Sequence, residues 1–510
     1  MVINNVKLNI GESNDVLKMK CCKQAKIPEN KIKYFKILKK SLDARKKNDI
    51  HYVCSVEISD NILDKSIKIF QPTNKPKGNT VIIGSGPAGL FSALILARAG
   101  FNPIVIERGG NVDERRACIE DFIKTKKLNV ECNVQFGEGG AGTFSDGKLN
   151  TGVKSENKDF VLNEFYLHGA NEEILYSNKP HIGSDVLPLV VKNIREEIIS
   201  LGGKFIFNAC FNDLEIKDGA VLSINYLKNG IKNTICVENL IIAIGHSSRD
   251  TYKMLYSKGI SMEKKDTAIG FRIEHLQSNI NKAQYGENYD KRLPTADYRL
   301  TSNVSTRGVF TFCMCPGGYV MPATSVENAV VTNGMSLSKR DGENSNSAIV
   351  VQVKKEDYPG DVLSGIEFIE NLEKKAYDLG GGDYVAPCQL VGDFLSGKES
   401  FSFKKVKPTY PLGTKFARLD TFLPNYLIEP LKKAIIDMNS RLNGFCDNDA
   451  ILTAVETRTS SPVRILRGEN LSSINVNNLY PIGEVGYAGG IMSSALDGVK
   501  VANQIIKKYN

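Results

Sequence analysis

The sequence predicts an α/β fold with a largely parallel sheet, and three observations support this class. Residues 80–109 read as a buried strand, a glycine-rich turn, an apolar helix and a second buried strand. An acidic residue, Glu107, stands at the end of that second strand. From residue 479 onward, a glycine-rich turn again precedes a helical pattern. Strands that alternate with helices are typical of a parallel sheet covered by helices.

Length and composition are those of a globular protein of two or three domains. The apolar stretch at residues 81–97 has nearly the length of a membrane span, but Gly84, Gly86, Pro87 and Gly89 interrupt its first half. The sequence does not begin with a basic segment, an apolar run and a small-residue cleavage site. The 11 cysteines are odd in number and mostly isolated, which favours a reducing compartment. We therefore expect a soluble, cytoplasmic protein without membrane contact.

The net charge belongs to one end of the chain. Residues 1–78 contain 17 Lys and Arg against 8 Asp and Glu, which accounts for the whole net charge of +9. This segment predicts a small basic α/β domain, with strands at 2–10 and 51–58, a helix at 15–26, and a strand followed by a turn at 32–44. A polar linker at residues 71–79 ends the predicted domain, which spans residues 1–77.

Three further sections are predicted after this domain. Residues 78–254 form the first part of a nucleotide-binding domain, residues 255–445 an inserted α+β substrate domain, and residues 446–510 the C-terminal part of the nucleotide-binding domain. Within the first section, helices are predicted at 113–127 and 187–201, and strands at 204–209 and 220–227. The insert has no dinucleotide fingerprint of its own.

The glycine turn at residues 84–89 carries the spacing G-x-G-x-x-G. Gly84 allows a tight turn, Gly86 lets the backbone approach a pyrophosphate, and Gly89 permits close helix packing. Glu107, 23 residues after Gly84, is placed to accept hydrogen bonds from a ribose. The predicted nucleotide contacts here are therefore Gly84, Ser85, Gly86, Pro87, Ala88, Gly89, Glu107 and Arg108.

A second match, formed by Gly137, Gly139 and Gly142, lacks the helix and the strand-end acid that a nucleotide site needs. We interpret it as a loop whose bare backbone approaches flat cofactor rings, and the alternative is a plain surface loop. The segment at residues 238–246 resembles the strand-to-glycine segment of flavoprotein domains. From these two segments the predicted cofactor contacts are Gly137, Gly139, Gly140, Ser145, Asp146, Gly147, Lys148 and Gly245.

The C-terminal pattern favours FAD over NAD as the dinucleotide. Gly483, Glu484, Gly489 and Gly490 precede an amphipathic helix that begins near Ile491. An extended FAD spans more of the sheet than NAD does, so it needs a second contact of this kind. We predict that all five residues bind FAD.

Several segments together resemble the family described as uncharacterised FAD-dependent, or NAD(FAD)-utilising, dehydrogenases of bacteria and plastids. They are GSGPAGL, FGEGGAGTFSDGKL, PHIGSD, AIGHSSRDT, IGFRIEH, FCMCPGGYV, TNGMS with RDGENSNSAIV, VETRTSSPVRI and YPIGEVGYAGGI, and they cover most of the chain after residue 78. The resemblance implies a Rossmann-like FAD domain of the glutathione-reductase type with an inserted substrate domain. It does not imply a substrate. Glu484 stands where many flavoproteins of the wider group carry Asp, so its longer side chain needs a small backbone adjustment to reach the ribityl chain.

Cys313 and Cys315 are candidate catalytic residues, because a thiolate beside a flavin can relay electrons or attack a substrate carbon. Buried structural thiols are the alternative. Two cysteines without Cys388 or a histidine do not make a zinc or iron–sulfur site, so no metal is predicted. His181 and His275 are candidate proton donors, and the alternative is an ordinary hydrogen-bonded histidine.

Arg272, Arg458 and Arg464 are candidate contacts for an anionic substrate, with structural ion pairs as the alternative. Arg458 and Arg464 lie in TRTSSPVR, where several donors converge within a few residues.

The leading hypothesis is an FAD-dependent oxidoreductase that acts on an organic, small-molecule substrate. NADH or NADPH is a candidate electron donor. One alternative is a flavoenzyme that modifies RNA through its basic N-terminal domain, where Tyr34, Phe35 and Tyr52 stand among lysines. The other is a flavin-bound redox protein that docks a protein partner. The oligomeric state stays open.

Overall fold

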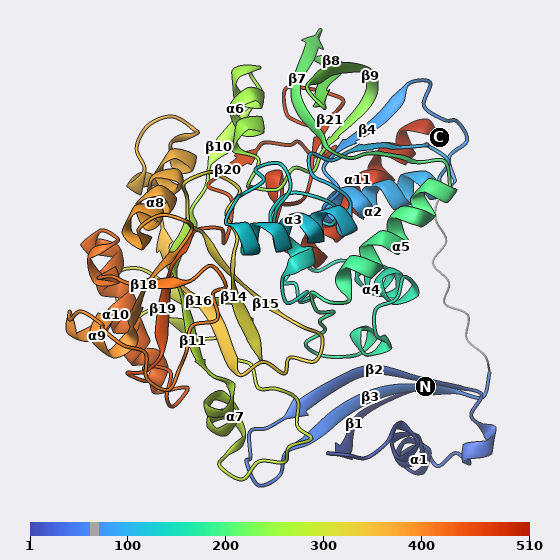
Figure 1. The fold of residues 1–510 in the computed structure, drawn as a ribbon. Helices are drawn as coiled ribbons and strands as arrows, with labels where there is room; N and C mark the ends of the chain where they lie inside the picture. Colours follow the sequence, from blue (N-terminus) through green and yellow to red (C-terminus); the bar gives the residue numbers. More distant parts are fainter. Residues whose placement is uncertain (62–70) are drawn as a thin grey trace.

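The computed structural model describes residues 1–61 and 71–510. Residues 62–70, which fall inside the predicted N-terminal domain, lie outside the described residues. Figure 1 shows three parts in one molecule: a small N-terminal sheet at the bottom, the predicted nucleotide-binding part at the upper right, and the predicted insert at the left.

The N-terminal part is a three-stranded antiparallel sheet in the order β1-β3-β2, with a helix packed on it. Its elements are β1 (Val2–Asn9), α1 (Asn14–Ala25), β2 (Tyr34–Asp43) and β3 (His51–Ser59). Residues 34–43, predicted as a strand and a turn, form one continuous strand because β3 pairs with β2 along its full length.

The nucleotide-binding part contains a sheet in the order β6-β5-β4-β9-β8-β7, with β21 paired to β9. Strands β4, β5, β6, β9 and β21 are parallel, whereas β7, β8 and the first half of β9 form an antiparallel extension. The strands are β4 (Asn79–Ile83), β5 (Ile104–Ile106), β6 (Lys204–Ile206), β7 (Ala209–Lys217), β8 (Ala220–Lys228), β9 (Ile231–Ile242) and β21 (Leu479–Pro481). The helices are α2 (Pro87–Arg98), α3 (Val112–Thr125), α4 (Lys158–Leu167), α5 (Leu187–Ser200), α6 (Arg249–Ser257) and α11 (Ile491–Ile506).

Helix α11 packs along α2, so the two ends of the nucleotide-binding part meet in space (Figure 1). Gly498 makes this close approach possible, because a Cβ there would lie 2.3 Å from the carbonyl oxygen of Ala88. Ten consecutive residues of α2, from Ala88 to Ala97, are buried. The apolar stretch at residues 81–97 is therefore a core strand, turn and helix. Within the described residues, no helix combines the length and apolar character needed to cross a bilayer.

The insert is built on a seven-stranded, mostly antiparallel sheet in the order β12-β13-β16-β11-β19-β17-β18. These strands are β11 (Thr267–Leu276), β12 (Thr301–Ser302), β13 (Val309–Cys315), β16 (Asn344–Val353), β17 (Ala386–Leu390), β18 (Thr414–Phe416) and β19 (Ile451–Glu456). Two further pairs are β10 (Met262–Lys264) with β20 (Val463–Ile465), and β14 (Gly318–Pro322) with β15 (Thr332–Ser336). The helices are α7 (Gln277–Tyr285), α8 (Ser364–Gly380), α9 (Val391–Ser396) and α10 (Asn425–Asn439).

The sheet of the insert extends past the boundary predicted at residue 445. Strand β19 lies between β11 and β17, although its sequence position suggested the C-terminal part of the nucleotide-binding domain. Pairing of strands so distant in sequence depends on tertiary contacts that local patterns do not contain.

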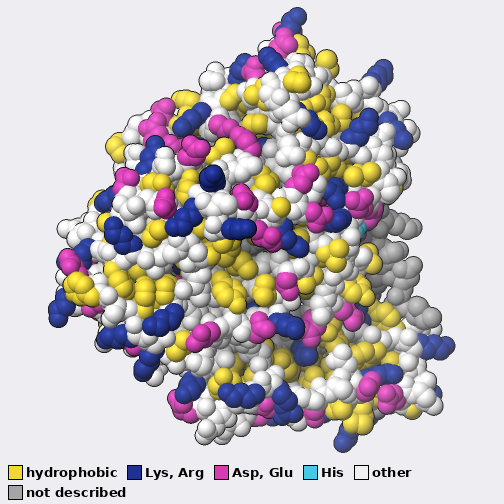
Figure 2. All heavy atoms as spheres, viewed as in Figure 1, with side chains coloured by type: hydrophobic (Ala, Val, Ile, Leu, Met, Phe, Trp, Pro, Cys, Tyr) yellow, Lys and Arg dark blue, Asp and Glu magenta, His cyan; other side chains and the backbone are white. Residues whose placement is uncertain are grey.

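The N-terminal sheet contacts both other parts. Lys40 of β2 exchanges backbone hydrogen bonds with the segment at residues 176–178, at 2.7 and 3.1 Å. The Lys47 ammonium donates to the carbonyl of Ala283 in α7 at 3.1 Å. Figure 2 shows Lys and Arg side chains interspersed with acidic side chains over the viewed face, including its lower part.

Phe271 provides a test of the core of the insert. It is fully buried on β11 and its ring packs against Phe394 and Phe422 at centroid distances of 5.8 and 6.3 Å. Replacing it with alanine should lower the free energy of unfolding by about 3–5 kcal/mol, because apolar contacts are lost and a cavity remains. Phe401→Ala is the matched control, since that ring is 81% exposed. Denaturant unfolding of both variants checks this, and equal midpoints would contradict the assigned core.

Candidate functional site

The glycine turn at residues 84–89 (the dinucleotide turn) joins β4 to α2. Gly84 has a φ of +100°, a conformation that glycine adopts without strain. A Cβ at Gly89 would lie 1.9 Å from the carbonyl oxygen of Gly84, so only glycine lets α2 begin so close to the strand. The positive end of α2 therefore faces the space next to the turn, where a phosphate is favoured.

Glu107 lies directly after β5, and its carboxylate joins the dinucleotide turn to the backbone at residues 109 and 137. Its Oε2 accepts hydrogen bonds from the backbone N–H of Ser85 at 2.9 Å and from the Ser85 hydroxyl at 2.8 Å. Its Oε1 accepts from the backbone N–H groups of Gly109 and Gly137 at 3.1 and 3.0 Å. A carboxylate offers about four acceptor positions, so protein donors fill all of them. A ribose hydroxyl would have to replace one of these donors.

Residues 137–148 (the glycine loop) lie against the dinucleotide turn. The N–H of Gly139 donates to the carbonyl of Ser85 at 2.9 Å. A Cβ at Gly140 would lie 3.0 Å from the Cα of Gly86, so the two backbones nearly touch. The second G-x-G-x-x-G match therefore forms a backbone surface beside the first one. A 3-10 turn at Ala141–Phe144, rather than an α-helix, follows its first glycines.

The side chain of Arg115, on α3, holds the glycine loop in place by hydrogen bonds to its backbone. Its guanidinium is completely buried and donates to the carbonyls of Asn133, Val134, Glu138 and Gly140 at 2.7–2.9 Å, with a longer contact to Gly137 at 3.4 Å. Burial lowers the pKa of Arg115 to about 10, while nearby Glu107 acts in the opposite direction. The group therefore remains charged at neutral pH. One cation thus donates to several carbonyls of this irregular stretch of backbone.

The C-terminal segment at residues 483–491 (the return segment) meets the glycine loop from the other side. A Cβ at Gly142 would lie 2.6 Å from the Ile491 side chain. The hydroxyls of Thr151 and Ser493 are 2.8 Å apart. Gly490 has a φ of +89°, and a Cβ added there would meet none of the described residues within 4 Å, so its backbone is bare. Three segments distant in sequence thereby converge.

These segments line a cavity of about 500 Å³. The predicted cofactor contacts that line it are Gly84, Gly86, Pro87, Ala88, Glu107, Arg108, Gly137, Gly140, Ser145, Asp146, Lys148, Gly245, Gly483, Glu484, Gly489, Gly490 and Ile491. Ser85, Gly89, Gly139 and Gly147 do not line it; they hold the surrounding backbone.

The return segment also carries Glu484, which is fixed by two donors. Its Oε2 pairs with His246 Nδ1 at 2.5 Å, and its Oε1 accepts from the backbone N–H of Ser461 at 3.0 Å. These contacts hold the pKa of Glu484 below its usual range, against the effect of burial, with His246 the main favourable partner. His246 Nε2 is buried without a hydrogen-bond partner among the described residues.

Cys313 lines the cavity, whereas Cys315 is fully buried behind it. The neighbouring Cys315 thiol, followed by Lys148 and Arg272, lowers the pKa of Cys313 to about 5. Burial and the adjacent Cys313 raise the pKa of Cys315. These opposite shifts favour the thiolate form at Cys313 and the protonated thiol at Cys315.

The Lys148 ammonium connects the glycine loop with β13, the strand that carries Cys313 and Cys315. It donates to the carbonyl of Met314 and lies 3.3 Å from Asp146 Oδ2. Asp146 also accepts two hydrogen bonds from Arg340. These cations hold the pKa of Asp146 down at about 2 despite its burial. The end of the cavity that Cys313 lines is thus polar and charged.

The predicted histidines do not line the cavity. His181 Nε2 lies 3.1 Å from the carbonyl of Ser338, and His275 Nε2 lies 2.9 Å from the carbonyl of Phe445. Burial lowers the pKa of both histidines. Both match the alternative of hydrogen-bonded histidines, because each ring is held by a backbone carbonyl outside the cavity wall.

Of the three predicted arginines, Arg458 lines the cavity. Its Nη1 donates to the hydroxyls of Ser247 and Ser325 at 2.7 and 2.9 Å, its Nε pairs with Glu373 at 3.5 Å, and its buried Nη2 has no partner among the described residues. Arg272 is buried outside the cavity, where it pairs with Glu456 at 3.3 Å and donates to the carbonyl of Cys313 at 2.9 Å. Arg464 pairs with Glu263 between β20 and β10. The last two are structural ion pairs.

Several residues at the site were not predicted. They are Arg115 beneath the glycine loop, and Gln135, His246, Phe312 and Asn333 at the cavity wall. His246 follows the predicted Gly245, so its position in AIGHSS was an available signal. Arg115 had no such signal, since it looks like any charged residue of a surface helix.

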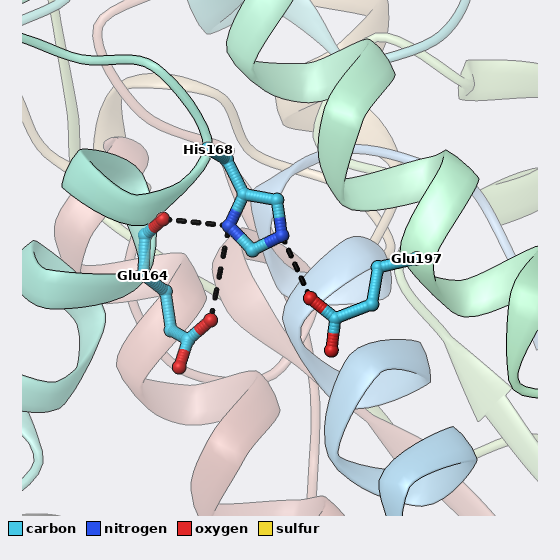
Figure 3. Close-up of side chains that lie close together, drawn as sticks. All are labelled: Glu164, His168 and Glu197. Carbon is cyan, nitrogen blue, oxygen red and sulfur yellow. Dashed lines mark hydrogen bonds and ion pairs between the residues drawn. The ribbon is translucent and has the colours of Figure 1, made fainter.

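Figure 3 shows a group of potential metal ligands, Glu164, His168 and Glu197, none of which lines the cavity. Arg98 donates to both carboxylates, at 2.7 and 2.8 Å to Glu164 and at 2.6 and 2.9 Å to Glu197. His168 Nε2 lies 2.9 Å from Glu197 Oε2. Since the guanidinium already contacts all four carboxylate oxygens, we interpret the group as an ion-pair network that joins α2, α4 and α5.

Comparison with known proteins gives three family matches. Residues 266–459 match "FAD-dependent protein, C-terminal domain-like", residues 77–121 match "FAD binding domain", and residues 1–59 match a domain of unknown function. An uncharacterised protein of Clostridium beijerinckii is 49% identical over 530 residues, which cover all of this chain and 99% of the relative. The mixed α/β chain therefore contains an FAD-binding domain.

Solved structures with a similar arrangement are distant. The flavin-dependent brominase Bmp2 is 11% identical with a TM-score of 0.38, covering 84% of this chain and 79% of that one. A geranylgeranyl bacteriochlorophyll reductase-like protein from Thermoplasma acidophilum is 10% identical with a TM-score of 0.39, covering 86% and 82%. Scores this low support no conclusion about a shared activity.

Arg115→Met tests the role of the buried guanidinium. The loop carbonyls lose their charged donor, so the free energy of unfolding should fall by at least about 2 kcal/mol and FAD should bind more weakly. Arg116→Met is the matched control, because Arg116 is exposed on the same helix and should change stability by less than about 0.5 kcal/mol. Denaturant unfolding and flavin titration measure both effects. Equal FAD affinity in the two variants would contradict this role.

Proposed function

Since the chain belongs to the same family as its uncharacterised Clostridium beijerinckii relative and matches the domain models "FAD binding domain" and "FAD-dependent protein, C-terminal domain-like", we propose that it is an FAD-dependent oxidoreductase with a glutathione-reductase-type FAD domain. It exchanges hydride with an organic, anionic small molecule. The observation that carries the proposal is the convergence of the dinucleotide turn, the glycine loop and the return segment on one cavity that also exposes Cys313.

The cavity wall fits the three sections of FAD. The bare glycine backbones of the dinucleotide turn and the positive end of α2 suit the pyrophosphate. Arg108 and Phe136 stand at the end next to β5, where they suit the adenosine. Gly489, Gly490 and the start of α11 suit the pyrimidine edge of the flavin. When bound, FAD supplies hydride transfer at flavin N5.

The protein's own residues fix the cavity wall and balance the charges along it. Glu107 and Arg115 hold the glycine loop, so that its backbone forms a fixed wall. Lys148 balances the charge of Asp146 and of the Cys313 thiolate. Arg458 is the proposed contact for an anionic substrate, because it lines the cavity and, besides its pair with Glu373, keeps a buried Nη2 without an acceptor among the described residues.

NADH or NADPH as electron donor is part of the proposal. The RNA-modifying alternative has no specific support in the described N-terminal part, where Lys7, Lys20 and Arg45 pair with acidic residues of the same part.

The test is the colour and reduction of the purified protein. It should carry about one FAD per chain and show a flavin spectrum. Anaerobic mixing with NADH, NADPH or reduced ferredoxin, followed by absorbance, should bleach the flavin with at least one of them. Gly86→Val should abolish FAD retention, because a branched side chain replaces the bare backbone at the phosphate position.

Gly308→Val is the matched control, since a Cβ at Gly308 meets only the Asn303 side chain at 3.6 Å, and this glycine does not line the cavity. This variant should stay yellow. Colourless wild-type protein that FAD neither binds nor stabilises would refute the proposed function.

A further inference from the structure

The cysteine pair has a local backbone geometry that brings its two residues close together. Along β13, the three steps from Phe312 to Cys315 oppose only two steps along β16, which marks a β-bulge. Two strand steps cover about 6.8 Å, so each step within the bulge advances about 2.3 Å on average. Along the strand axis the bulge therefore brings Cys313 and Cys315 closer than in a regular strand, where the spacing of about 6.8 Å between such residues lies at the upper end of the range of about 4.4–6.8 Å between the Cα atoms of a disulfide.

The bulge has a second effect at Cys313. This residue has a φ of +44°, a left-handed conformation that is costly for a side chain with a Cβ. Bulges and such conformations re-aim side chains at functional sites. Here Cys313 lines the cavity and Cys315 is fully buried next to it, with Cys315 Sγ 3.3 Å from the carbonyl oxygen of Cys313.

Charged groups from two other elements surround the pair. Arg272 of β11 donates to the carbonyl of Cys313 and lies 3.6 Å from Cys315 Sγ. Lys148 of the glycine loop donates to the carbonyl of Met314, between the two cysteines. These cations favour the thiolate, which is the reactive form in thiol oxidation.

We propose that Cys313 and Cys315 form a reversible dithiol–disulfide pair that exchanges two electrons with FAD bound in the cavity. This inference rests on the proposed function, because it requires the flavin to occupy the cavity that Cys313 lines.

The proposed exchange between the cysteine pair and FAD balances in electrons and protons. When the S–S bond forms, the Cys313 thiolate and the Cys315 thiol together lose two electrons and one proton. Oxidised FAD takes up these two electrons and that proton to become the anionic reduced form. In the reverse direction, the reduced cofactor returns both electrons and the proton as the S–S bond breaks. No other oxidant or reductant is needed for this step.

Anaerobic titration with dithionite tests the pair in the FAD-loaded protein. An enzyme with an active disulfide should take up four electrons per FAD, whereas a flavin alone takes up two. Cys313→Ser and Cys315→Ser should each reduce the uptake from four electrons to two while retaining FAD.

The chain offers a matched control. Cys118 and Cys132 also lie close enough to interact, but neither lines the cavity. Cys118→Ser should therefore keep the four-electron uptake. Loss of two electrons in this variant, instead of in the Cys313 and Cys315 variants, would overturn the proposal.

A mass measurement of the wild-type protein covers the case in which a serine variant fails to fold. In the oxidised, FAD-loaded enzyme, the peptide that contains residues 313 and 315 should be lighter by two hydrogen atoms than after reduction. If both thiols are free in the oxidised enzyme and the uptake is two electrons with FAD bound, the redox pair is refuted and the proposed function stands. Colourless protein refutes both.

The Cys313 thiolate also gives a pH readout. Once the disulfide is reduced and the flavin is oxidised, a thiolate in contact with the flavin should give a long-wavelength absorbance band. Cys315, Lys148, Arg272, Asp146 and Glu456 act on Cys313, and the pKa of Cys313 is lowered to about 5. The band should be present at neutral pH and decline as the pH falls through about 5. Its absence in the wild-type protein at pH 7 would contradict contact between Cys313 and the flavin.

Discussion

The buried guanidinium of Arg115 is the interaction on which the site depends. Apart from one 3-10 turn, the glycine loop and the residues just before it lack helix or strand, and Arg115 supplies charged donors to four of their backbone carbonyls in the interior. The loop in turn contacts the dinucleotide turn, the return segment and β13. Each of these contacts requires the loop backbone in one conformation. A single cation therefore positions three walls of the cavity at once.

Burying that cation has an electrostatic cost, and the surrounding acids reduce it. Glu107 and Glu138 both act on Arg115, and Glu138 is itself buried, with a raised pKa caused mainly by desolvation. Such a set is stable when its hydrogen bonds are complete and costly when one member is removed. The same carboxylate of Glu107 that the sequence suggested for a ribose is thus occupied in holding protein backbone.

The sequence predicted the parts of the fold that local patterns encode. The strand, turn and helix at residues 79–98, the N-terminal strands and the return segment all contain their own periodicity and glycines. The position of β19 within the insert was not predictable, because it depends on pairing with β11 and β17. At the site, backbone contacts were predicted better than side chains. His275 and Arg464 are directed away from the cavity by strand geometry that a motif does not reveal.

The N-terminal sheet bridges two parts of the molecule, through residues 176–178 on one side and Ala283 on the other. A hinge motion that separated the FAD-binding part from the insert would stretch one of these attachments or carry the sheet with it. The small basic sheet is thus a second connection between the two larger parts, beside direct contacts such as the pair of Arg249 with Glu373. The described residues of this sheet make the connection without contributing to the wall of the cavity that the two larger parts share.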